Sequence, residues 1–169
     1  MLTVTAAVSA DAHRLCRVAA AAFTVDETFK PPGAVPGGPP GHDCLERHRA
    51  WIRQWDYYKI CRDYRVVGGC IVIPQAGRLE LFGLFVDAAH MGRGIGGRLL
   101  RAVMARYPDD HVWTLETPDY SIGTHRFYER FGFRPCRRSS PDPSLGFGFV
   151  TYQRKPAHNC DAPEEKKRP

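Results

Sequence analysis

The chain has 169 residues and a net charge of +6, and its hydrophobic fraction of 43% and charged fraction of 25% are ordinary for one globular domain. No apolar run approaches the roughly 20 residues that span a bilayer, and the amino terminus lacks the basic and apolar regions of a secretory signal. The six cysteines form no CxxC pair and no zinc-finger spacing, so we expect a cytoplasmic protein with mostly buried, reduced thiols and no metal site.

The first half of the chain predicts a strand, two helices and three further strands. A strand over 2–8 precedes an alanine-rich helix to about Phe23, which Ser9 or Asp11 can cap. Prolines and glycines exclude regular structure from 30 to 41, where we expect a surface loop. An amphipathic helix over 44–55 then leads to strands over 57–63, 66–73 and 79–86, the first two joined by a tight turn near Asp63 and Tyr64.

The second half predicts two helices alternating with strands. A helix over 94–107 ends before Pro108, a strand covers 111–117, and a helix over 122–131 is closed by Gly132. Strands over 133–138 and 145–154 follow. The order predicts one α/β (α+β) domain over 1–155, with a mixed, mostly antiparallel sheet of about seven strands and about four flanking helices, and a flexible tail over 156–169.

The segment between the strand over 79–86 and the next helix is rich in glycine, with Met91-Gly92-Arg93-Gly94-Ile95-Gly96-Gly97 followed by Arg98. Glycines at a helix start let an anion approach main-chain N–H groups, and the helix dipole adds partial positive charge. Three interpretations compete: a simple connection, a dinucleotide site of the form GxGxxG with Glu116 about 20 residues on, and a cradle for the pyrophosphate of coenzyme A. The spacer between strand and glycines disfavours the dinucleotide site.

Two motifs narrow this choice. The first combines Phe85-Val86-Asp87, a spacer, the glycines from Gly92 to Gly96, and Leu99-Leu100; the second is the run FYERFGF over 127–133. In this order they resemble the acetyl-CoA signature and the fourth-helix signature of the GNAT superfamily of N-acetyltransferases. Met91 stands where the family has Gln or Arg, Ser121 where it usually has Asn, and Thr124 where it usually has Ala.

The resemblance implies a GNAT-like fold, acetyl-CoA as donor and a primary amine as acceptor. It implies that the fourth and fifth strands splay at a bulge, where the pantetheine arm of the donor pairs with main chain. Tyr128 falls on the motif position of the acid that protonates the thiolate, and Glu80 is the candidate base, with Glu116 as the alternative. His90 and His125 are weaker candidates. The implied donor-binding residues are Leu84, Phe85, Val86, Met91, Gly92, Arg93, Gly94, Ile95, Gly96, Gly97, Arg98 and Ser121.

Several alternatives stay open at this point. Glu80 can equally be a strand-end carboxylate paired with Arg78, and Tyr128 an ordinary core aromatic. A catalytically silent acyl-CoA-binding module and a nicotinamide-dependent oxidoreductase are the rival functions. The acceptor, a small molecule or a peptide, is unspecified, although Asp26, Glu27 and Asp43 would suit a cationic amine. We expect no membrane or nucleic-acid partner, and the oligomeric state, a homodimer included, is left open.

Overall fold

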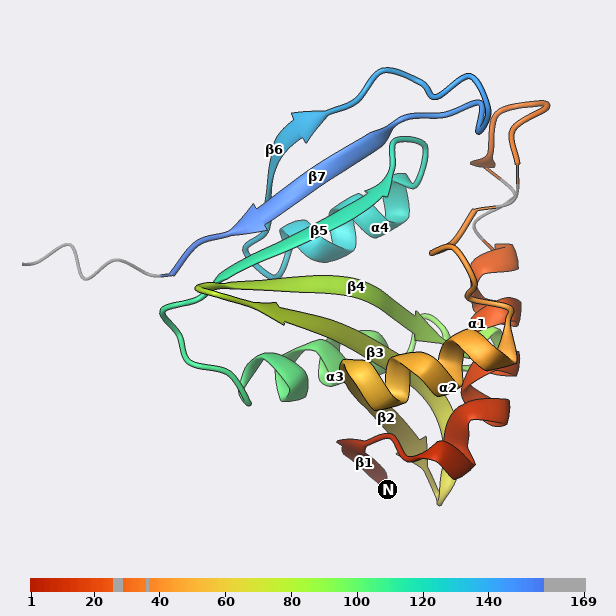
Figure 1. The fold of residues 1–169 in the computed structure, drawn as a ribbon, viewed down its shortest axis with the longest axis vertical. Coiled ribbons are helices and arrows are strands. Elements are labelled where there is room, and N and C mark those ends of the chain that lie inside the picture. The colour runs from red at the N-terminus through yellow and green to blue at the C-terminus, as the bar shows by residue number, and fades with distance from the viewer. Residues whose placement is uncertain (26–28, 36, 157–169) are drawn as a thin grey trace, which may run out of the picture.

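A seven-stranded sheet forms the centre of the computed structural model, which describes residues 1–25, 29–35 and 37–156 (Figure 1). Its strands are β1 (Leu2–Ala6), β2 (Asp56–Arg62), β3 (Arg65–Gln75), β4 (Arg78–Val86), β5 (Val112–Pro118), β6 (Arg134–Arg138) and β7 (Phe149–Arg154). They lie in the order β1-β2-β3-β4-β5-β7-β6. Only β4 and β5 pair in parallel, which confirms the mixed, mostly antiparallel sheet predicted from the sequence.

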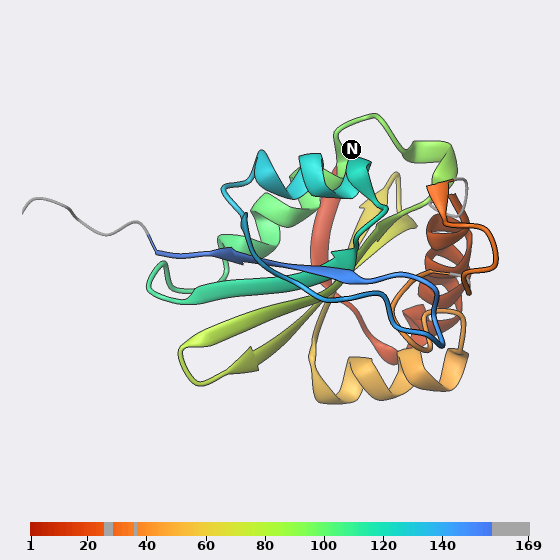
Figure 2. The ribbon, with the colours of Figure 1, turned by 90° about the horizontal axis from the view of Figure 1, so that it is seen from above.

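Two pairs of helices cover opposite faces of the sheet (Figures 1 and 2). Leucines and other apolar residues of α3 (Ile95–Met104) and α4 (Ile122–Glu129) share one core with the sheet. Residues of α1 (Ala12–Val25) and α2 (Leu45–Gln54) share the other. Two short 3₁₀ turns that the sequence did not predict, η1 (Ser9–Asp11) and η3 (Ala88–His90), also occur. No helix among the described residues is long and apolar enough to span a bilayer.

Every described strand and helix from 2 to 154 belongs to this sheet or packs on it. The domain boundary near residue 155 stays a prediction, and the tail over 157–169 lies outside the described residues. The cysteines differ from the expectation: Cys16 and Cys70 are buried, Cys61 is half-buried, and Cys44 and Cys136 are exposed. Within the described part of the chain, no group of three or more His, Cys, Asp or Glu side chains could hold a metal ion.

The boundaries of the elements follow local hydrogen bonds. Asp63 and Tyr64 both adopt positive φ, 48° and 67°, which forms the tight turn predicted between β2 and β3. Helix α3 ends at Met104, before the predicted 107, because the N–H groups of Arg106 and Tyr107 bond carbonyls three residues back, at 3.0 and 3.2 Å. The Tyr107 hydroxyl donates to Asp56 Oδ2 on β2 at 2.7 Å. Strand β7 begins at 149, after the predicted 145, because the N–H of Gly146 bonds the carbonyl of Asp142 at 2.8 Å in a turn.

A buried polar pair lies in the core beneath α1 and α2. His48 is fully buried, its Nε2 donates to the carbonyl of His42 at 2.8 Å, and its Nδ1 accepts from the Tyr57 hydroxyl at 2.8 Å. Because a carbonyl can only accept, Nε2 carries a proton, and in the neutral imidazole Nδ1 is then the acceptor for the Tyr57 hydroxyl. Burial accordingly lowers the pKa of His48, and it raises the pKa of Tyr57.

Strand β4 contains a bulge that decides which way its side chains face. In the pairing with β3, Ile71 lies opposite Gly83 and Val72 opposite Leu81, so Phe82 is an extra residue. Before the bulge, the core beneath α3 and α4 receives Leu79 and Leu81; after it, the same core receives Leu84 and Val86. Phe82 and Phe85 pack into the core beneath α1 and α2.

Candidate active site

The parallel pairing of β4 and β5 is short, and the two strands diverge beyond it (Figure 1). Only the residues from Arg78 to Glu80 pair with β5, where Glu80 lies opposite Thr114. The described main chain of β4 beyond Glu80 therefore has no strand paired on its β5 side. Unpaired strand edges can accept an added extended segment through main-chain hydrogen bonds. The structure thus contains the splayed strands and the bulge that the sequence resemblance implied.

The connection from β4 to α3 is held at its start by Asp87. The N–H of Asp87 bonds the carbonyl of Val67 at 2.8 Å, and one Asp87 carboxylate oxygen caps η3 through the N–H of Ala89 at 3.1 Å. The other oxygen forms an ion pair with Arg14 at 2.9 Å. These contacts fix the spacer as a turn, so that the glycine loop starts from a defined position.

The glycines of the loop serve different purposes. Gly92 and Gly94 adopt φ values of 72° and 74°, which residues with a Cβ rarely adopt, and both are exposed. Gly96 lies in the first turn of α3, where a Cβ would sit 3.6 Å from Val86, 3.7 Å from Leu84 and 3.7 Å from Phe127. The loop, strand β4 and helix α4 therefore meet at Gly96.

The other loop residues predicted to bind the donor are either buried in packing contacts or exposed. Gly97 and Ile95 are buried, and a Cβ on Gly97 would come within 3.0 Å of Phe131, so both have packing roles. Met91 and Arg93 are exposed. Arg98 is exposed and donates to the carbonyl of Leu2 at 3.4 Å. Donor binding by these side chains stays a prediction.

Helix α4 brings Ser121 and Tyr128 to the same face of the sheet. Ser121 is the N-cap residue and is 4% exposed, and its hydroxyl has no hydrogen-bond partner among the residues that the structure describes. Tyr128 is buried, with its ring 5.1 Å from that of Phe127 and 5.6 Å from that of Phe133. Helix α4 ends at Glu129, two residues before the predicted 131, and Gly132 follows in a turn at φ 84°. A buried hydroxyl that has no partner among the described residues, close to the meeting point of the loop, β4 and α4 at Gly96, fits a polar, extended donor between α3, α4 and β4.

The two carboxylates that compete as base are in different environments. Glu80 is half-buried, receives a long hydrogen bond of 3.5 Å from Gln75 Nε2, and forms no ion pair with any described residue, Arg78 included. Glu116 is exposed, accepts from the Thr151 hydroxyl at 3.1 Å and lies 3.6 Å from Arg137. Glu80 therefore has fewer and weaker contacts with neighbouring side chains than Glu116 has.

The two histidines considered from the sequence also differ. His125 is buried, and its Nε2 lies 2.9 Å from the carbonyl of Pro118, which gives it a structural role at the start of α4. His90 lies in η3, and its buried Nδ1 has no partner within the described part of the chain.

Two loops that are far apart in the chain meet close to the β4 bulge. The N–H of Val35 bonds the carbonyl of Leu145 at 3.0 Å, which ties the proline- and glycine-rich loop to the connection between β6 and β7. Pro39 from the same loop lies 3.6 Å from the position of a Cβ on Gly83, next to the bulge. Asp43 is exposed, and Asp26 and Glu27 lie outside the described residues.

Comparison with known proteins supports one interpretation of this arrangement. A model of the acetyltransferase (GNAT) family matches residues 23–133, which contain the glycine loop and the fourth-helix motif. No curated protein sequence matches the chain significantly. The family match supports coenzyme A over a dinucleotide as the ligand of the loop.

Solved structures of acetyltransferases share the fold at low sequence identity. The ribosomal-protein-S18-alanine N-acetyltransferase from Escherichia coli superposes with a TM-score of 0.72 at 14% identity, covering 98% of both chains. The PaiA N-acetyltransferase from Thermoplasma acidophilum, solved with coenzyme A, gives 0.71 at 14% identity, covering 92% of this chain and 99% of that one. The acetyltransferase YncA from Salmonella typhimurium, solved with acetyl-CoA, gives 0.70 at 16% identity over 98% and 99%.

Proposed function

Because the chain belongs to the acetyltransferase (GNAT) family and is an acetyl-CoA-dependent acyltransferase, we propose that it transfers the acetyl group to a primary amine by direct attack. In this proposal Glu80 is the general base and Tyr128 the general acid. The acceptor is a small molecule or a peptide that presents a free amine. The donor lies along β4 and over the glycine loop.

This proposal rests on the bulge in β4, which changes the side of the sheet that the following side chains face. Leu84 and Val86 face the side of α3 and α4, where the glycine loop and Ser121 also lie. Glu80 lies between Leu79 and Leu81, which face that side, so its own side chain projects to the side of α1 and α2. A donor from one side and an amine from the other can therefore meet at the unpaired edge of β4, with no need for a covalent enzyme intermediate.

Each proposed residue then has one task. Glu80 accepts a proton from the amine, whose nitrogen forms a bond to the thioester carbon. Main-chain N–H groups of β4 stabilise the negative charge that develops on the thioester oxygen. Tyr128 donates its proton to the sulfur as the carbon–sulfur bond breaks. Gly92, Gly94 and Gly96 leave room for the pyrophosphate to approach main-chain N–H groups.

The test is a screen of amines with acetyl-CoA that detects the free thiol and the acetylated product. Small primary amines, amino acids and short peptides with a free amino terminus form the panel, and samples without amine give the background hydrolysis. We expect thiol release that depends on one class of amine, with one acetylated amine per thiol. Direct transfer to a primary amine would be contradicted if the reaction must pass through an acetylated form of the protein. It would also be contradicted if no amine in the panel increases the release of thiol.

A further inference from the structure

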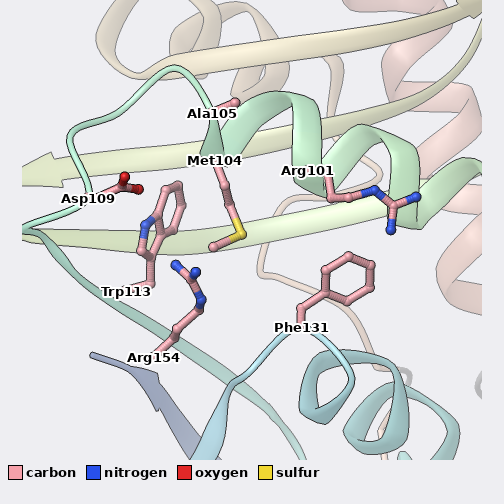
Figure 3. Close-up of a pocket in the computed structure, with 7 residues that line it drawn as sticks. All are labelled: Arg101, Met104, Ala105, Asp109, Trp113, Phe131 and Arg154. Carbon is pink, nitrogen blue, oxygen red and sulfur yellow. The ribbon is translucent and has the colours of Figure 1, made fainter. Parts of the chain in front are cut away.

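A pocket of about 180 Å³ lies between α3, the segment after α4 and the neighbouring ends of β5 and β7 (Figure 3). Trp113 and Phe131, which line it, pack in the core beneath α3 and α4, so the pocket is on the same side of the sheet as the glycine loop. The Arg101 guanidinium is turned past Phe131 and away from Arg154, so the two charges do not converge on one ligand. An amine that arrives from the α1 and α2 side meets different walls, which the loop between these helices forms.

Residues 37–43 of this loop form a strap that crosses the unpaired edge of β4. Pro39 lies 3.6 Å from the position of a Cβ on Gly83, which pairs with Ile71 and therefore faces the α1 and α2 side. Gly37 is buried against the segment after β5, where a Cβ on it would come within 2.5 Å of the Tyr120 hydroxyl oxygen. The strap thus extends from β4 to the end of β5, across the gap between the two strands, and Figure 1 shows the loop reaching the connection between β6 and β7.

The strap has a defined conformation. The N–H of His42 donates to the carbonyl of Pro39 at 2.9 Å and closes a main-chain turn. The His42 ring packs edge-on against Phe23, with the ring centres 5.0 Å apart. Gly38 has φ 108°, and a Cβ there would lie 2.8 Å from His42 Nδ1 and 3.0 Å from Phe23, so the backbone lies directly on these two rings. The position of Pro39 therefore follows from the position of His42.

His48 fixes His42 from the core. The His48 ring is fully buried, its centre lies 4.9 Å from that of Trp51 and 5.8 Å from that of Tyr57, and its Nε2 donates to the His42 carbonyl at 2.8 Å. Burial of a polar ring costs free energy unless its nitrogens are hydrogen-bonded, and no step of the proposed transfer uses this ring. One hydrogen bond thus connects the packed core to the strap, and through the turn to Pro39 at the bulge.

We propose that His48 is a positioning residue that holds the strap as a fixed wall of the acceptor site, and that this wall restricts the acceptor to amines on an unbranched carbon. The inference rests on the proposed attack at the unpaired edge of β4, where Pro39 would stand beside the carbon that carries the attacking nitrogen. A branch on that carbon would press against the wall, and one methyl group changes discrimination roughly 10–200-fold in a tight pocket. A linear alkylamine or a lysine side chain fits this wall, whereas an α-amino group does not.

The experiment compares kcat/KM for n-propylamine and isopropylamine with acetyl-CoA, because these isomers differ only in branching at the amine carbon. We expect the parent to prefer n-propylamine at least tenfold. His48→Leu keeps a buried apolar side chain but cannot donate to His42, so the preference should fall below threefold, with coenzyme A affinity by calorimetry changed less than twofold. Pro39→Ala removes the wall itself without touching the core and should lower the preference at least threefold.

Two further variants separate positioning from stability. His48→Gln has an amide nitrogen that can still donate to the His42 carbonyl, so it should keep the parental preference. Tyr57→Phe is the matched control, because it removes the other hydrogen bond of His48 and leaves the bond to His42; it should also keep the preference. The ratio of two rates in one sample does not depend on the fraction of folded protein, so a loss of stability alone does not change it.

Several results would overturn the inference. Equal use of both isomers by the parent, or a parental preference in Pro39→Ala, would show that the strap does not bound the acceptor. Turnover of neither propylamine, while a larger amine reacts, would show that other walls decide selectivity. A parental preference in His48→Leu, or an equal loss in His48→Leu and Tyr57→Phe, would remove the positioning role.

The anchor can also be tested without activity, through hydrogen exchange of the His42 amide. His48→Leu should speed this exchange at least tenfold, and Tyr57→Phe should change it less than threefold. If no amine is acetylated by the parent, the proposed function fails, while this measurement still decides whether His48 holds the strap. Equal exchange rates in the parent and His48→Leu would show that it does not.

Discussion

Replacement of Gly96 by alanine separates donor binding from folding at the centre of the candidate site. The added Cβ would lie 3.6–3.7 Å from its three nearest neighbours, Val86, Leu84 and Phe127, which is ordinary van der Waals contact. Glycine within a helix costs roughly 0.5–1 kcal/mol relative to alanine, so Gly96→Ala should fold at least as stably as the parent. The same methyl group would occupy space that the donor needs between α3 and β4. We expect coenzyme A binding to weaken at least tenfold, about 1.4 kcal/mol.

The assay combines denaturant unfolding with calorimetry of coenzyme A, and Gly77→Ala is its control. Gly77 has φ 69° in the hairpin between β3 and β4, with nothing within 4 Å of its Cβ position. Its replacement should therefore lower the free energy of unfolding by about 1–2 kcal/mol through backbone strain and leave coenzyme A affinity unchanged. The reasoning is wrong if Gly96→Ala binds coenzyme A as tightly as the parent, or if it loses stability as Gly77→Ala does.

Three further predictions follow from single side chains. Glu80→Gln should lower the acetylation rate most at low pH, where the amine is protonated, and the rate should recover above the pKa of the amine. If Glu80→Gln is as active as the parent at every pH and Glu116→Gln loses activity instead, the base is Glu116. Tyr128→Phe should lower kcat at least tenfold and change KM for acetyl-CoA less than about threefold, and a parental rate with intact binding would make Tyr128 a core aromatic. Burial lowers the pKa of His48 in the folded state, so the free energy of unfolding should fall as the pH drops below the unfolded-state pKa of about 6.5. His48→Gln should make the free energy of unfolding less dependent on pH in this range, which denaturant unfolding at several pH values would measure.

Much of the fold could be predicted because local chemistry and element order agree. Prolines and glycines predicted the loop over 30–41 and, to within two residues, the end of α4. The helix predicted over 94–107 is α3, which buries Ile95, Leu99 and Val103. The errors lie at ends controlled by distant residues. Tyr107, just after α3, bonds Asp56, which lies 51 positions earlier in the chain, and no local pattern carries that information.

The candidate site was predictable only where it is one continuous segment. The glycine loop and the α4 motif are short runs, so the sequence alone locates them. The strap is different, because its position depends on His48 in the next helix, on Tyr120 after β5 and on Gly83 in β4, and each of these residues is unremarkable in its own segment. The unpartnered hydroxyl of Ser121 is likewise visible only once the packing around α4 is known.

The bulge in β4 could be expected from the family resemblance, but it could not be derived from the pattern of residues in the strand. Strict alternation from Leu79 would place Leu84 and Val86 on the same side as Glu80, beneath α1 and α2. Both sides of β4 are covered by helices, so apolar residues are acceptable in either direction, and the pattern does not specify the extra residue. Phe82 supplies it, opposite the step between Ile71 and Val72. As a result, Leu84 and Val86 join the side of the glycine loop while Glu80 stays on the other side. The proposed direct transfer depends on this separation, because one strand edge can then receive the donor and the amine from opposite sides.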